Sequence, residues 1–173
     1  MRTIFLAVLA VSALTACAAR GPDMQTVDHV DIERFMGDWY VIANIPTFLE
    51  KGAHNAVESY RLDEDGSIAT TFTFRKDGFD GKAKQYNPRG FVRDTESNAI
   101  WGMRFVWPFK SDYRIVYLNE DYTQTIIGRQ SRDYVWIMAR TPQISDQDYD
   151  RLRWAVGSLG YDPSQLQRVP QRW

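Results

Sequence analysis

Hydrophobic and polar residues alternate in short runs from about residue 39 onward, and turn-forming residues interrupt these runs at regular intervals. The runs are rich in Val, Ile, Thr, Tyr, Phe and Trp, which favour β-strands. The intervals carry Asp, Gly, Asn, Ser and Pro, as in Asp63–Gly66, which is typical of tight turns. The pattern predicts eight strands, at about residues 39–45, 54–62, 67–75, 81–92, 99–107, 112–119, 123–130 and 133–141.

The connections between these strands are too short for parallel pairing. A parallel pair needs a long crossover, usually a helix, and no helical pattern separates the runs. Eight antiparallel strands favour an all-β fold, an eight-stranded up-and-down barrel, because closure removes exposed sheet edges. A two-sheet sandwich is the alternative that the pattern leaves open. Asn87-Pro88 predicts a bend inside the fourth strand.

A single amphipathic helix follows the strands. Ser145 and Asp148 have the spacing of a capping box, and Gly160 is placed to end the helix. The helix must cover something apolar, and the outside of the barrel is the candidate. A shorter helical turn, capped by Asp31, precedes the first strand, and residues 166–173 could add a short final strand. The apolar stripe of the main helix is Tyr149, Leu152, Val156 and Leu159.

The first residues have the features of an export signal. Arg2 precedes an apolar run from Ile4 to Leu14, which is short for a membrane span but suits a signal peptide. The run ends in Leu14-Thr15-Ala16-Cys17, which resembles a bacterial lipobox. Cys17 is the only cysteine, so it has no disulfide partner, and lipid attachment would explain it. A plain secretory signal with a coincidental cysteine is the alternative.

These features predict three segments. Residues 1–16 are a lipoprotein signal peptide, 17–29 a lipidated N-terminus and tether, and 30–173 the folded domain. Ala18 stands where an aspartate would retain many bacterial lipoproteins at the inner membrane. We therefore expect an anchor in the outer membrane, through the N-terminal lipid, with the domain facing the periplasm.

Composition narrows the function further. The chain of 173 residues carries 21 basic and 22 acidic side chains, and no basic stripe occurs, which speaks against nucleic-acid binding. Six Trp, nine Tyr and nine Phe indicate a large interior or an apolar pocket. A merely aromatic-rich core is the competing interpretation.

Signatures of enzymes and metal sites fail when checked. His29 and His54 have no nearby cluster of ligand residues, and neither a Gly-x-Ser-x-Gly motif nor a Walker loop is present. The sequence therefore predicts no catalytic activity, no cofactor and no metal. Haem bound through His54 or a tyrosine is a weaker alternative.

Three motifs in order resemble the lipocalin family. They are Gly37-x-Trp39 at the first strand, Asp121-Tyr122 in a late turn, and Arg140 after the last strand. The local sequence DYVWIMARTP at 133–142 is similar to the bacterial outer-membrane lipoprotein lipocalins and the apolipoprotein-D-like branch. The resemblance covers about residues 30–170. It departs from the family at 71–84, where the third and fourth strands look long and their register is open.

The resemblance implies roles for the motif residues. Trp39 would fill the narrow closed end of the barrel, Arg140 would pack its guanidinium on the indole, and Gly37 would allow the preceding turn to approach closely. It also implies binding of fatty-acyl or lysophospholipid-like molecules, for lipid storage or transport in the cell envelope. A lipocalin-fold isomerase or de-epoxidase and a protein-binding scaffold are the rival functions. A homodimer is plausible if aromatic residues at the barrel mouth are exposed.

Strand alternation selects the candidate ligand-binding residues. Side chains point alternately in and out, so the positions that share the parity of Trp39 and Arg140 line the interior. Glu58 shares the parity of Tyr60 and is included, although we favour a one-residue slip that leaves its carboxylate in water. The inward set is Ile45, Glu58, Tyr60, Phe72, Phe74, Trp101, Met103, Phe105, Tyr113, Ile115, Tyr117, Tyr134, Trp136 and Met138.

Overall fold

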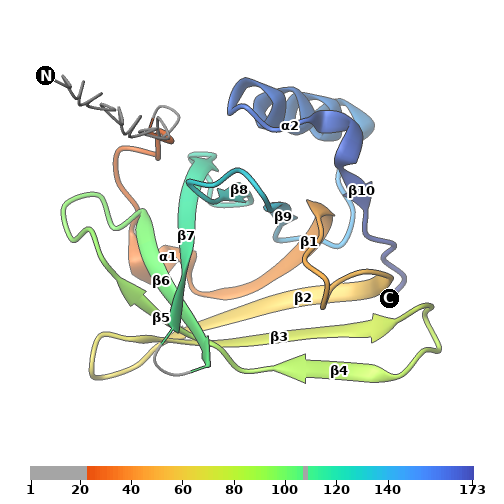
Figure 1. Cartoon of the computed structure of the whole chain (residues 1–173), viewed down its shortest axis with the longest axis horizontal. Coiled ribbons are helices and arrows are strands. Elements are labelled where there is room, and N and C mark those ends of the chain that lie inside the picture. Colours follow the sequence, from red (N-terminus) through yellow and green to blue (C-terminus); the bar gives the residue numbers. More distant parts are fainter. Residues whose placement is uncertain (1–22, 107–108) are drawn as a thin grey trace, which may run out of the picture.

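The computed structural model describes residues 23–106 and 109–173 as one closed β-barrel with a helix on its outside (Figure 1). The segments predicted as signal peptide and lipid attachment site, Cys17 included, lie outside the described residues. The helices are α1 (Ile32–Phe35), α2 (Asp146–Ser158) and the 3-10 turn η1 (Pro163–Gln165). The strands are β1 (Gly37–Ile45), β2 (Ala53–Leu62), β3 (Ile68–Lys76), β4 (Ala83–Tyr86), β5 (Arg89–Val92), β6 (Ile100–Val106), β7 (Phe109–Leu118), β8 (Gln124–Gly128), β9 (Val135–Ala139) and β10 (Gln167–Arg168).

All of the pairings are antiparallel, the strands follow one another around the wall in sequence order, and β1 pairs with β9 to close the barrel. The predicted barrel is therefore confirmed, and the sandwich alternative is wrong. The predicted fourth strand is interrupted at Asn87-Pro88, so β4 and β5 both pair with β3 and share one place in the wall. The long third and fourth strands that depart from the family pattern form the β3–β4 hairpin at the lower right of Figure 1. The tail adds β10 against β1, as expected.

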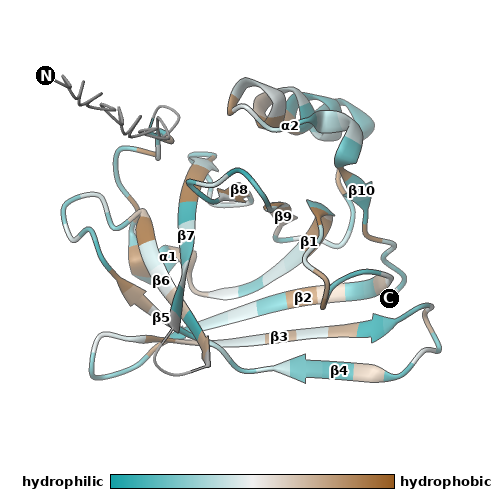
Figure 2. Cartoon of the chain, in the orientation of Figure 1, coloured by the Kyte–Doolittle hydropathy of each residue, from teal (hydrophilic) through white to brown (hydrophobic). Residues whose placement is uncertain are grey.

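The core has two layers, because side chains along each strand point alternately into and out of the barrel. Figure 2 shows hydrophobic and hydrophilic residues alternating along the strands. The inward set forms an inner cluster around Trp39, Trp101 and Ile115. The outward set of β1, β8 and β9 forms an outer cluster with the apolar stripe of α2. The helix thus covers the outside of the barrel where three strands carry apolar residues on both faces.

Two β-bulges reverse the inward and outward alternation of side chains, and two residues predicted to point inward therefore point outward. The register of β1 shifts between Val41 and Ala43, so Ile45 turns outward into the cluster under α2. The register of β7 shifts between Ile115 and Tyr117, and Tyr117 also faces outward, where its hydroxyl accepts a hydrogen bond from Arg151 of α2 (2.6 Å). Since each bulge adds one residue to a strand, every position beyond it changes face.

The closed end is held by the contact that the family resemblance implies. The guanidinium of Arg140 lies 3.9 Å from the Trp39 ring centroid. It also donates to the backbone carbonyls of Tyr122 (3.2 Å), Asp38 (2.9 Å), Arg34 (2.8 Å) and Phe35 (3.1 Å). These carbonyls belong to α1, to the start of β1 and to the β7–β8 turn. The cation, which follows β9, therefore joins the stretch of α1 and β1 to the β7–β8 turn, so that three parts of the chain distant in sequence meet at this end.

Gly37 and the Asp121-Tyr122 turn adapt the backbone to this junction. Gly37 has φ +92°, which a side chain would strain, and a Cβ there would lie 3.4 Å from the Arg140 guanidinium. Tyr122 adopts φ +57°, and its hydroxyl accepts a hydrogen bond from the backbone of Asp31 (2.9 Å). The turn that contains Asp121 and Tyr122 is thereby fixed to the helical turn across the barrel end.

The main helix begins at the predicted cap. The Ser145 hydroxyl accepts a hydrogen bond from the amide of Asp148 (3.0 Å), and Gly160, at φ +89°, follows the helix end. We expect Ser145→Ala to lower the free energy of unfolding by about 1 kcal/mol, because an amide of the first turn loses its partner. In thermal unfolding this corresponds to a decrease in Tm of roughly 2–4 °C. Ser158→Ala, near the C-terminal end of the same helix, should change Tm much less, and equal losses would contradict the capping role.

Candidate ligand-binding site

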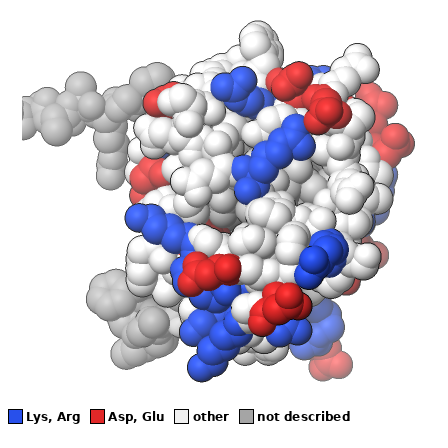
Figure 3. Space-filling view, turned by 90° about the vertical axis from the view of Figure 1, so that its right-hand side faces the viewer, with Lys and Arg blue, Asp and Glu red and all other residues white. Residues whose placement is uncertain are grey.

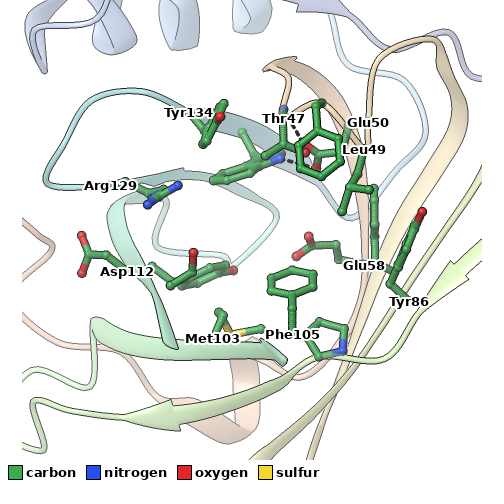
Figure 4. A pocket seen from close by; sticks show the side chains of 16 residues that line it. Thr47, Leu49, Glu50, Glu58, Tyr86, Met103, Phe105, Asp112, Arg129 and Tyr134 are labelled. Atoms are coloured by element: carbon green, nitrogen blue, oxygen red, sulfur yellow. Dashed lines mark hydrogen bonds between the residues drawn. The ribbon is translucent and has the colours of Figure 1, made fainter. Parts of the chain in front are cut away.

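A cavity opens into the barrel between the β1–β2 loop and strands β6, β7 and β9. It holds about 930 Å³ of space, its open mouth included. Most of the lining side chains are aromatic or aliphatic. They are Thr47, Phe48, Leu49, Glu50, Glu58, Phe72, Tyr86, Pro88, Met103, Phe105, Ser111, Asp112, Tyr113, Arg129, Tyr134 and Trp136 (Figure 4).

Below the cavity, stacked aromatic rings fill the barrel. The Phe35 ring packs on Trp39 with the centroids 5.0 Å apart and on Trp101 at 5.5 Å. Trp101 stacks nearly parallel on Tyr113 at 5.2 Å, and Tyr60 meets Trp101 edge-on at 5.9 Å. All of these rings are buried. They close the inner end of the cavity, where Glu58 and Tyr113 form part of its surface.

Glu58 directs its carboxylate into this cavity (Figure 4). The slip that we favoured from the sequence is therefore wrong, because Glu58 pairs across the sheet with Trp39 and Phe72, which both face inward. The Tyr60 hydroxyl donates a hydrogen bond to Oε2 of Glu58, and the Tyr60 and Tyr113 hydroxyls are 2.7 Å apart. Burial among these rings raises the pKa of Glu58 to about 7.

Burial and the adjacent carboxylate also act on the two tyrosines. The pKa of Tyr60 and the pKa of Tyr113 both rise well above the ordinary tyrosine value, first through desolvation and then through the negative charge of Glu58. Both phenols therefore keep their protons at neutral pH and act as hydrogen-bond donors. At the cavity floor, Glu58 and Tyr113 therefore present a carboxyl and a hydroxyl group to a mostly apolar cavity, and Tyr60, just outside the lining, contacts both of them.

A second carboxylate, Glu50, lies in the β1–β2 loop and is buried. Its Oε1 accepts a hydrogen bond from the Trp136 indole (2.8 Å), and its Oε2 accepts one from the Thr47 amide (2.8 Å). Desolvation raises the pKa of Glu50, and these hydrogen bonds oppose the rise. One oxygen thus holds the loop against β9 and the other closes the loop on itself, so Glu50 fixes one side of the entrance.

The entrance carries exposed apolar side chains and one cation. Phe48 is 77% exposed and Phe105 is 54% exposed. Arg129 forms an ion pair with Asp133 (3.2 Å), while its buried Nε has no hydrogen-bond partner among the described residues. In Figure 4 it lies on the side of the cavity opposite Glu58. The cavity therefore has a carboxylate on one wall and a guanidinium on the other.

Half of the predicted ligand-binding residues line the cavity. They are Glu58, Phe72, Met103, Phe105, Tyr113, Tyr134 and Trp136. Five others point inward but lie in the packed inner cluster outside the lining: Tyr60, Phe74, Trp101, Ile115 and Met138. Ile45 and Tyr117 face outward because of the bulges.

Sequence reasoning missed the loop that forms part of the entrance. Residues 47–50, with the sequence Thr-Phe-Leu-Glu, have no strand periodicity, and we assigned them no role. Two adjacent apolar residues in a predicted turn were the available signal, because turns between strands are usually polar. Wall residues beside strand ends, such as Ser111 and Arg129, lacked any distinguishing pattern.

Within residues 23–106 and 109–173, no group of three or more His, Cys, Asp or Glu side chains could hold a metal ion. In that same part of the chain, no helix has the length and apolarity to cross a membrane. On the face shown in Figure 3, acidic and basic side chains lie among one another around a largely uncharged centre.

Comparison with known proteins assigns most of the chain to one kind of domain. The model of the lipocalin-like domain matches residues 30–171. Temperature-induced lipocalin-1 of Arabidopsis thaliana is 32% identical over 161 residues, which cover 86% of this chain and 83% of that protein. Outer membrane lipoprotein Blc of Escherichia coli K12 is 29% identical and covers 99% of this chain and 98% of its own.

Solved structures agree with the fold. Insecticyanin from the tobacco hornworm Manduca sexta superimposes with a TM-score of 0.67 at 15% identity, covering 86% of this chain and 84% of its own. Lobster apocrustacyanin A1 gives a TM-score of 0.65 at 13% identity, covering 83% of this chain and 81% of its own. At these identities the likeness concerns the barrel and its helix.

Proposed function

The chain belongs to the lipocalin family, and from this premise we propose that its barrel binds a hydrophobic ligand with a long acyl chain, of the fatty-acid or lysophospholipid kind. The observation that carries the proposal is the apolar cavity that remains open above the stacked rings. Each methylene transferred from water into such a cavity contributes about 0.8 kcal/mol. A chain of about ten carbons therefore supplies several kcal/mol to set against the cost of association.

We further propose that the protein works in the cell envelope, anchored in the outer membrane through lipid on Cys17, and that it stores or moves its ligand there. Two observations support this place. The sequence Leu14-Thr15-Ala16-Cys17 resembles a lipobox, and a relative that matches nearly the whole chain is named an outer membrane lipoprotein. Mass spectrometry of the mature N-terminus tests the anchor, since an unmodified or absent Cys17 would contradict it.

A bulky side chain inside the cavity tests the binding function. Ser111 lines the wall, so Ser111→Trp should fill part of the space and weaken binding of a fluorescent fatty acid at least about tenfold. Thr71→Trp is the matched control, because Thr71 neighbours the inward-facing Phe72 on β3 and faces the other side of the sheet. Equal affinity in both variants and the unmodified chain would contradict binding in this cavity, provided that both variants unfold at similar temperatures.

One observation favours a second function, a lipocalin-fold isomerase. Catalysis of this kind needs an acid and a base close together in an apolar cavity, and Glu58 with Tyr60 and Tyr113 meets that requirement. Turnover of a hydrophobic substrate that disappears in Glu58→Gln would support this function. Unchanged ligand recovered after long incubation would favour binding alone.

A further inference from the structure

The inner end of the cavity is polar, although its walls are apolar. A ligand that enters tail first would place its terminal methyl group against the Glu58 carboxylate and the Tyr113 hydroxyl. That contact would remove the carboxylate from water without giving it a hydrogen bond, which is unfavourable. A ligand that enters with its polar end first would bring that end to the same two groups. The polar groups at the inner end of the cavity therefore favour a ligand that enters with its polar end first.

Counting hydrogen bonds shows which carboxylate can take a ligand. Both oxygens of Glu50 already accept hydrogen bonds from the protein. Asp112 accepts bonds from Gln130 and Arg114 and turns away from the cavity in Figure 4. Glu58 accepts one bond at Oε2, and no described residue donates to its Oε1. Glu58 is thus the lining carboxylate that points inward with an oxygen available.

We propose that Glu58 binds the polar end of a long-chain ligand that donates a hydrogen bond, a hydroxyl or an ammonium group, and that such a ligand enters polar end first. The inference rests on the proposed binding of a long-chain ligand, and among such ligands it favours a polar end that donates a hydrogen bond over the carboxylate of a fatty acid. A carboxylate of the ligand in this orientation would face Glu58 and be repelled, since two like charges share one apolar space. An anionic lipid would instead keep its charged end at the entrance, on the side of Arg129.

The charges around the floor set the pH dependence of this preference. Because the pKa of Glu58 is about 7, its carboxylate is mostly ionised at pH 8 and mostly protonated at pH 6. An alkylammonium ion should therefore bind more tightly at pH 8 than at pH 6, whereas the affinity for an alcohol should differ little between these two pH values. The other titratable or charged groups in the lining are Glu50 from the β1–β2 loop, Tyr86 from β4, Asp112 and Tyr113 from β7, Arg129 after β8 and Tyr134 before β9, and Tyr60 from β2 touches Glu58 from outside the lining.

Three probes of equal chain length test the proposal: decylamine, 1-decanol and decanoate, titrated into the full-length chain at pH 8 and pH 6. At pH 8 we expect decylamine and decanol to bind about tenfold or more tightly than decanoate. In Glu58→Gln, the affinity for decylamine should fall about tenfold, while the affinity for decanoate should rise. Glu64→Gln, in the exposed β2–β3 turn, is the matched control, and it should bind the three probes with the same order of affinities as the unmodified chain.

A second measurement keeps the test independent of how well Glu58→Gln folds. In ¹³C NMR of the unmodified chain, decylamine should lower the pH midpoint of the Glu58 carboxyl signal, because the bound cation favours the ionised form. If all three probes bind alike and the midpoint does not move, the orientation is wrong while the binding function stands. If none of the probes binds, the proposed function itself fails.

Discussion

Replacing Arg140 with methionine is expected to lower the free energy of unfolding by about 3–5 kcal/mol, a large share of the stability of a domain of this size. The substitution keeps much of the apolar stem but removes the contact with the Trp39 ring and the donors to four backbone carbonyls. Each carbonyl that stays buried without a partner costs about 1 kcal/mol or more. Urea unfolding followed by tryptophan fluorescence measures the loss.

Arg104→Met is the matched control for this experiment. The guanidinium of Arg104 also lies over an aromatic ring, that of Phe91, with 4.8 Å to the centroid. Among the described residues it donates to no backbone carbonyl, so its removal should cost less than about 1 kcal/mol. Similar losses in the two variants would show that the ring contact alone, rather than the junction of three segments, accounts for the role of Arg140.

The sequence predicted the fold well because the signals for it are local. Alternation, turn residues and the Ser145 cap depend on neighbours in sequence, and the barrel and the helix are both present in the structure. The contact between Trp39 and Arg140 is present too, but it was expected from the family resemblance and not from a local signal. The break at Asn87-Pro88 was also predicted, since proline cannot donate in the sheet. These features need no knowledge of how the strands are aligned.

The candidate site was predicted less completely because it depends on register. A bulge adds one residue without a distinct sequence signal, and it moved Ile45 and Tyr117 to the outer face. How far the rings fill the barrel is also a matter of packing, so Trp101 and Met138 point inward but lie below the cavity rather than along it. Alternation indicates which face a residue occupies, but not whether space remains in front of it.

Glu58 is the residue whose environment has the clearest consequence for stability. Its pKa in the folded chain, about 7, is above the ordinary value of 4.5, so the folded state binds this proton more tightly than the unfolded chain. The resulting stabilisation is fully present below pH 4.5 and is lost as the pH rises through 7. A shift of this size corresponds to about 3 kcal/mol, less where the cavity admits water.

Glu58→Gln should therefore stabilise the protein at high pH and leave it nearly unchanged at low pH. At pH 8 we expect a free energy of unfolding about 2–3 kcal/mol above that of the unmodified chain, because a neutral amide replaces a poorly solvated charge. The amide oxygen can still accept the hydrogen bond of Tyr60. Urea unfolding at intervals from pH 4.5 to pH 8.5 measures the difference between the two curves.

The shape of that difference separates the carboxylate from its neighbours. Glu50 also has a raised pKa, so part of the decline in stability with pH should persist in Glu58→Gln. Glu64→Gln, in an exposed turn, should follow the curve of the unmodified chain. A constant offset between Glu58→Gln and the unmodified chain at every pH would show that Glu58 does not titrate in this range. We expect the difference in free energy of unfolding between the two proteins to grow from pH 5 to pH 8 and to become smaller when decylamine is added. That result would show that the ammonium group of the ligand compensates the unfavourable charge of Glu58.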